Sequence, residues 1–86
     1  MTASDRVITE LRTRAASGEP PSTILRWLKD ELRSDFSHVR FYHILMEAFG
    51  IPLVVLRDSE NWVGLSPQGT ESDQELNARM GRWISQ

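Results

Sequence analysis

Two histidines are the first residues to consider for chemistry, because an imidazole can bind a metal ion or transfer a proton. His38 and His43 are the only histidines of the 86-residue chain. Five positions apart on a helix, they point about 140° away from each other and cannot share a metal ion. His43 and Glu47 could supply two ligands, but a zinc site needs three or four, and the chain has no cysteine. The sequence therefore predicts no metal site and no cofactor.

The sequence gives no support for nucleophilic or acid–base catalysis either. The serines fall at predicted helix caps and in loops, without a Gly-x-Ser-x-Gly elbow. The five glycines do not form a cluster that could hold a phosphate. Asp58 and Glu60 form a pair of carboxylates, but in a loop with no predicted apolar pocket to raise the pKa of one of them. We therefore expect that the protein is not an enzyme.

An acidic stretch extends from Asp58 to Glu75 and contains five acidic residues and no basic residue. We expect it to be a local source of negative potential. Trp62 lies within it, and tryptophan is enriched at binding hot spots, although packing of this ring into the core is the simpler alternative. These features predict a contact surface for a partner protein with a basic surface, formed by Asp58, Glu60, Trp62, Glu71 and Asp73.

Helical spacing of apolar residues predicts the elements that must carry these side chains. It indicates four helices, at about residues 4–17, 22–33, 38–49 and 72–84. The third helix is the most hydrophobic, so we expect it to be the central one. Ser22 and Ser37 are the expected N-caps of the second and third helices, and Gly50 is the expected C-cap of the third. Ser72 and Glu75 have the spacing of a capping box.

Residues 53–65 are ambiguous. Leu53–Leu56 is consistent with a short helix that begins after Pro52, or with one arm of a hairpin that returns through Trp62–Leu65. We favour the helix slightly. The predicted fold is an all-α bundle of four or five short helices, in a single domain over residues 1–86. An α+β fold with one β-hairpin around residues 53–65 is the alternative.

The third helix and the segment after it also resemble a helix-turn-helix motif, because a Gly turn and an apolar residue connect them. In a DNA reader, the positions that follow are polar or basic and face the major groove. Here residues 53–55 are Leu-Val-Val, and acidic Asp58 and Glu60 follow. These carboxylates would repel phosphates. A small DNA-binding regulator is therefore the alternative function, and we do not expect nucleic acid to be the partner.

Parts of the chain resemble small orphan proteins of bacterial toxin–immunity loci. The resemblance is carried by Phe41–Leu53, by Asn61-Trp62 and by Ser72–Leu76, and it spans about residues 25–84. Such proteins often have a helix ending in Ala-Phe-Gly, a short apolar segment, a tryptophan, and an acidic, capped final helix. The resemblance implies an inhibitor that binds and occludes a partner protein. It identifies no individual contact residue.

Composition and charge narrow the class of protein further. The chain is 40% hydrophobic and 26% charged, with a net charge of −2, which is ordinary for a globular domain and argues against a dedicated nucleic-acid binder. The first residues lack the pattern of a signal peptide, and no apolar run approaches the length of a membrane span. We therefore expect a cytoplasmic protein-binding module, of inhibitor or immunity type, that does not contact membranes. A homo-oligomer remains open.

Overall fold

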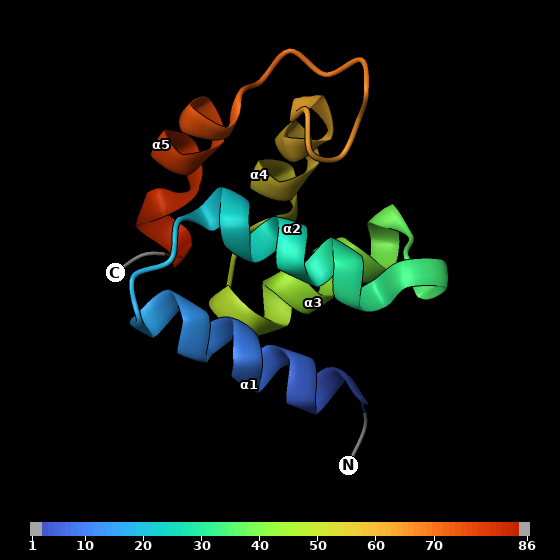
Figure 1. Cartoon of the computed structure of the whole chain (residues 1–86), viewed down its shortest axis with the longest axis vertical. Coiled ribbons are helices and arrows are strands. Elements are labelled where there is room, and N and C mark those ends of the chain that lie inside the picture. Colours follow the sequence, from blue (N-terminus) through green and yellow to red (C-terminus); the bar gives the residue numbers. More distant parts are fainter. Residues whose placement is uncertain (1–2, 85–86) are drawn as a thin grey trace.

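The computed structural model of the chain describes residues 3–84, and this range contains five α-helices (Figure 1). They are α1 (Ala3–Ala16), α2 (Pro21–Leu32), α3 (His38–Phe49), α4 (Leu53–Asp58) and α5 (Asp73–Ile84). Short 3-10 helices follow α2 and α4, namely η1 (Arg33–Asp35) and η2 (Ser59–Asn61). The predicted all-α bundle is confirmed. Residues 53–58 form a helix, and the only bridge outside helices in the described range is an isolated one between Trp62 and Glu71.

Local capping residues determine where α3 begins and ends. The Ser37 hydroxyl accepts a hydrogen bond from the backbone N–H of Arg40 at 3.1 Å. Gly50 ends the helix in the left-handed region, with a φ of 68° that a residue with a side chain rarely adopts. Both predicted caps of this helix are confirmed, because they depend only on residues next to the helix in sequence.

The predicted Ser22 cap of α2 is wrong. The helix begins at Pro21, and Pro20 is its N-cap residue without a side-chain cap bond. A proline at the first helical position is already set to a helical φ and has no N–H that would need a partner. Ser22 is instead buried in the first turn, and its N–H donates to the Asn77 Oδ1 atom at 2.7 Å. A side chain of α5 therefore accepts a hydrogen bond from a backbone N–H in the first turn of α2.

The helices form a bundle whose middle layer is α2 and α3 together. The helix α1 packs on α3 and α2, α5 packs on α2, and α4 packs on α3. In Figure 1, α1 lies at one end of this layer, and α4 and α5 lie at the other. The expected central helix α3 thus shares its position with α2. The fully buried side chains of the core include Leu11, Leu25, Leu28, Phe41, Leu45, Leu56, Trp62, Leu76 and Met80.

The capping box predicted at the start of α5 is present. The Ser72 hydroxyl accepts from the Glu75 N–H at 3.2 Å, and the Glu75 carboxylate accepts from the Ser72 N–H at 3.0 Å. These bonds, the one from the Ser72 backbone foremost, lower the pKa of Glu75. Two of the free N–H groups at the helix start are thereby satisfied.

We expect Ser72→Ala to lower the free energy of unfolding by about 1 kcal/mol, because one N-cap hydrogen bond is lost. Chemical denaturation followed by circular dichroism measures this change. The matched control is Ser34→Ala, at an exposed serine in η1. An equal, negligible effect of both substitutions would show that this cap does not stabilise α5.

Candidate protein-interaction surface

The indole ring of Trp62 is fully buried, with an exposed fraction of 0%. It packs in the main hydrophobic cluster, and its Nε1–H donates to the Asp73 Oδ1 atom at 2.9 Å. Gly64 lies directly against the ring, where a Cβ atom would clash with it. The expectation that Trp62 is an exposed anchor for a partner is therefore wrong. The apolar surface of the Trp62 ring is buried and its N–H group is hydrogen-bonded within the fold. This is the alternative in which the ring packs into the core.

Asp73 is also engaged within the fold. Its Oδ1 atom accepts from Arg26 Nη2 at 2.7 Å as well as from Trp62. Arg26 lies on α2, and its guanidinium stands over the Trp62 ring at 5.0 Å from the ring centroid. The hydrogen bonds from Arg26 and then from Trp62 lower the pKa of Asp73. Arg26, which lies 47 positions earlier in the sequence, thus compensates the negative charge of Asp73.

Glu71 forms the most enclosed ion pair of the acidic stretch. Its two oxygens accept from Nε and Nη2 of Arg79 at 2.9 and 2.8 Å, and only 15% of its side chain is exposed. Arg79 also donates to the Val55 carbonyl oxygen at 3.0 Å and to the Ser59 hydroxyl at 3.1 Å. Glu71 is the main cause of a raised pKa of Arg79. This arginine connects α5 to α4, to η2 and to the loop before α5.

Asp58 and Glu60 remain exposed at the end of α4 and in η2. Glu60 lies near Tyr42, whose hydroxyl is buried and has no well-aligned hydrogen-bond partner among the described residues. Burial and then the negative charge of Glu60 raise the pKa of Tyr42 to about 12. Two of the five residues predicted to contact a partner thus keep exposed carboxylates. The other three are occupied by contacts within the fold.

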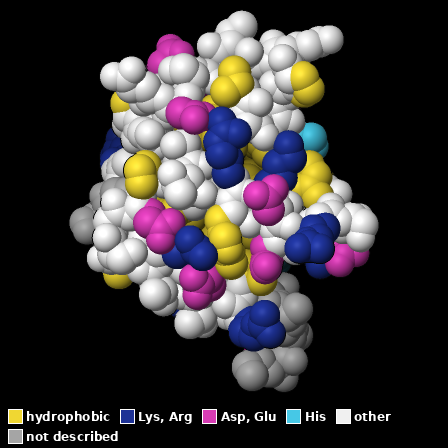
Figure 2. Space-filling view, viewed as in Figure 1, with side chains coloured by type: hydrophobic (Ala, Val, Ile, Leu, Met, Phe, Trp, Pro, Cys, Tyr) yellow, Lys and Arg dark blue, Asp and Glu magenta, His cyan; other side chains and the backbone are white. Residues whose placement is uncertain are grey.

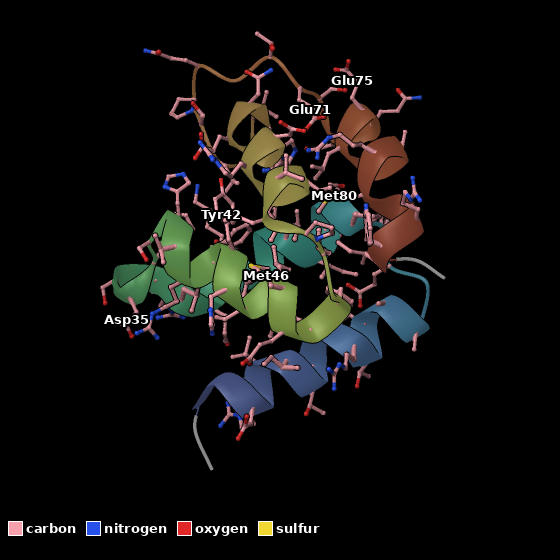
Figure 3. The ribbon with its side chains drawn as sticks, turned by 180° about the vertical axis from the view of Figure 1, so that it is seen from behind. Asp35, Tyr42, Met46, Glu71, Glu75 and Met80 are labelled. Carbon is pink, nitrogen blue, oxygen red and sulfur yellow. The ribbon has the colours of Figure 1, made fainter. Side chains whose placement is uncertain are left out.

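The acidic stretch is therefore not a continuous acidic surface. Figure 2 shows acidic and basic side chains interspersed on the face that it views. In Figure 3, which shows the opposite side, Glu71 and Glu75 lie together beside α4 and α5, far from Asp35. The bases that pair with the stretch come from α2 and from α5, so a count over residues 58–75 does not include them.

A second surface is apolar and was not predicted from the sequence. We define the α3–α4 face as Val39, His43, Met46, Leu53 and Val54. Val39 and Val54 are 79% and 69% exposed, and Met46 and Leu53 are also exposed. With Tyr42, four of these residues line a shallow groove of about 260 Å³. Figure 3 shows this side of the molecule, with α3 in front, α4 above it, and Met46 labelled on α3.

The helical geometry explains why these side chains are outside. Val39 and Met46 are seven positions, about two turns, apart and therefore share one side of α3. The opposite side carries Phe41, Ile44, Leu45 and Ala48, which are buried against the other helices. We expected this mostly apolar helix to be the central one, against which the other helices pack. The spacing of Val39, His43 and Met46 was the available signal that α3 has a second apolar side.

Comparison with known proteins assigns no function to this surface. No family model, no curated protein and no solved structure matches the chain. Within residues 3–84, no group of three or more potential ligand side chains could hold a metal ion. None of the helices in that range is long and apolar enough to cross a membrane. The function of the protein must therefore be inferred from the two surfaces themselves.

Proposed function

We propose that this protein is a protein-binding module whose α3–α4 face docks on a partner protein chain. One observation carries the proposal: the exposed side chains of Val39, Met46 and Leu53 line one groove between two consecutive helices, and exposed Val54 follows Leu53 on α4. Burying apolar surface is favourable by about 25 cal/mol per Å². Single exposed apolar residues are ordinary, but neighbouring ones on one face are typical of an interaction surface.

The exposed carboxylates support a partner that also carries basic groups. Asp58 is the last residue of α4 and Glu60 lies in η2 just after it, whereas Leu53 and Val54 lie at the start of α4. Charges at the rim of an apolar contact orient the partner and accelerate association. An apolar centre with acidic residues at one edge is thus the surface that we assign to binding.

An inhibitor of immunity type is the narrower form of this proposal. Its support is the sequence resemblance over residues 25–84, together with a mode of action that needs no catalytic group. Such a protein acts by covering a surface that its partner needs. DNA binding has less support, because α4 has six residues, exposes Leu53 and Val54, and carries Arg57 as its single basic residue.

Photo-crosslinking in cells that contain the protein tests the proposal. A photoreactive amino acid at position 54 is expected to give a discrete crosslinked protein species, because Val54 lies on the α3–α4 face. The control is the same amino acid at position 23, where exposed Thr23 lies on α2. The additional substitution Val39→Asp should remove the species formed from position 54. Absence of any crosslink specific to position 54 would refute the proposal.

A further inference from the structure

We infer that the partner of the α3–α4 face is a second copy of this chain, with its α3 antiparallel to the first. The inference rests on the proposed protein-binding function, since it names the partner of the same face, and it replaces the narrower inhibitor form, in which that face covers a different protein. Two observations support it: the order of the charges along α3 and the shape of the surface around Val39. Both features are self-complementary under a two-fold rotation.

The charges of α3 stand beside its exposed apolar side chains. Arg40 and Glu47 are seven positions apart, so both lie on the same edge of the α3–α4 face. Arg40 forms no ion pair within the described part of the chain. The Glu47 carboxylate forms no ion pair with a lysine or arginine in the described range; His43 Nε2 lies 3.8 Å from one of its oxygens and is charged only when protonated, and Arg12 Nη2 donates to the Glu47 carbonyl oxygen at 3.2 Å. Two exposed charges of opposite sign are therefore available to a neighbouring molecule.

The order of these charges selects the antiparallel orientation. A two-fold axis that crosses α3 near residues 43 and 44 sets Arg40 of each copy opposite Glu47 of the other. The pair thus gains two ion pairs between copies. In a parallel pair with two-fold symmetry, this edge of α3 would instead face the opposite edge of the partner helix, so Arg40 and Glu47 could not pair between copies. Charge complementarity of this kind fixes the relative orientation of two chains at an interface.

The shape of the face is consistent with the same arrangement. Val39 lines the shallow groove that contains Tyr42, Met46 and Leu53, and it also lines a second one of about 430 Å³ beside Arg40 and Ile44. Its side chain therefore stands on the ridge between two depressions. Antiparallel copies can place this ridge in a groove of the partner, as helices do when ridges pack into grooves.

The small number of apolar residues predicts the strength of this dimer. The five residues of the α3–α4 face make up a minor part of the 5363 Å² surface. Interfaces that bury less than about 1200 Å² in total are characteristic of weak or transient complexes. We therefore expect a dimer that dissociates on dilution, so its test needs a range of concentrations up to about 1 mM.

A charge exchange between Arg40 and Glu47 tests the inference. Arg40→Glu alone and Glu47→Arg alone each create two like-charge contacts per homodimer, and each should weaken dimerisation about tenfold or more. An equimolar mixture of these two variants should form the heterodimer, because all four facing residues then have opposite partners. The double variant Arg40→Glu/Glu47→Arg should dimerise like the original chain. Sedimentation equilibrium measures each association constant.

The control is Asp30→Arg, a charge reversal at an exposed position of α2, which should leave dimerisation unchanged. Circular dichroism verifies that each variant is folded. A chain that remains monomeric up to about 1 mM, or a mixture that associates no better than its separate variants, would overturn the inference. If the chain is monomeric and position 54 crosslinks to a different protein, the proposed function holds and the dimer is rejected. If position 54 crosslinks to nothing, both are rejected.

Discussion

Replacing Trp62 by alanine is expected to lower the free energy of unfolding by about 3–5 kcal/mol. The ring is fully buried, so its removal leaves a cavity in the core. It also removes the donor that reaches Asp73 and the ring on which the guanidinium of Arg26 rests. Urea denaturation followed by circular dichroism measures the loss.

Two further substitutions separate the causes of this loss. Trp62→Phe keeps an aromatic ring but has no N–H for Asp73, so we expect an intermediate effect. Trp83→Ala is the matched control, because Trp83 is only partly buried against the core. If Trp62→Ala and Trp83→Ala destabilise the protein equally, Trp62 is not the core residue that the structure describes.

Reversing the charge of Glu71 is the second substitution with a large expected effect. We expect Glu71→Lys to destabilise the fold by about 3 kcal/mol, because it leaves a largely buried guanidinium without its partner and adds a like charge. The bonds from Arg79 to Val55 and Ser59 would be strained at the same time. Thermal unfolding at low and high salt measures the effect.

Glu60→Lys is the control within the same acidic stretch. Glu60 is exposed, so its reversal should change stability by about 0.5 kcal/mol or less. Equal stability of the two lysine variants would contradict the role of the Glu71–Arg79 pair. Substitutions that probe binding by the acidic stretch belong at Asp58 and Glu60, since those at Glu71 and Asp73 would alter the fold as well.

The helices could be predicted from sequence because their signals are local. Ser37 and Gly50 delimit α3, and the pair of Ser72 and Glu75 starts α5. Each of these interactions spans four residues or fewer. Even the ambiguous segment after Pro52 follows a local rule, since a proline is tolerated at the start of a helix, where its missing N–H needs no partner.

The surface could not be predicted to the same extent, because it depends on residues far apart in sequence. The charges of Glu71 and Asp73 are balanced by Arg79 on α5 and by Arg26 on α2. Counting the charges within one continuous segment leaves out partners that lie elsewhere in the sequence. Likewise, the composition of α3 does not reveal how many helices surround it, so the exposure of Val39 could not be predicted from it.

The contacts of α5 bear on how the chain folds during synthesis. This helix provides Arg79 for α4 and η2, Asp73 for the Trp62 ring, and Asn77 for the start of α2. Until residues 73–84 have left the ribosome, these groups have no partner from α5, and the face of α2 on which α5 packs is uncovered. The four earlier helices therefore emerge as an incomplete assembly with exposed apolar surface, which is the kind of species that chaperones bind. Native packing becomes available in one late step, when α5 is released.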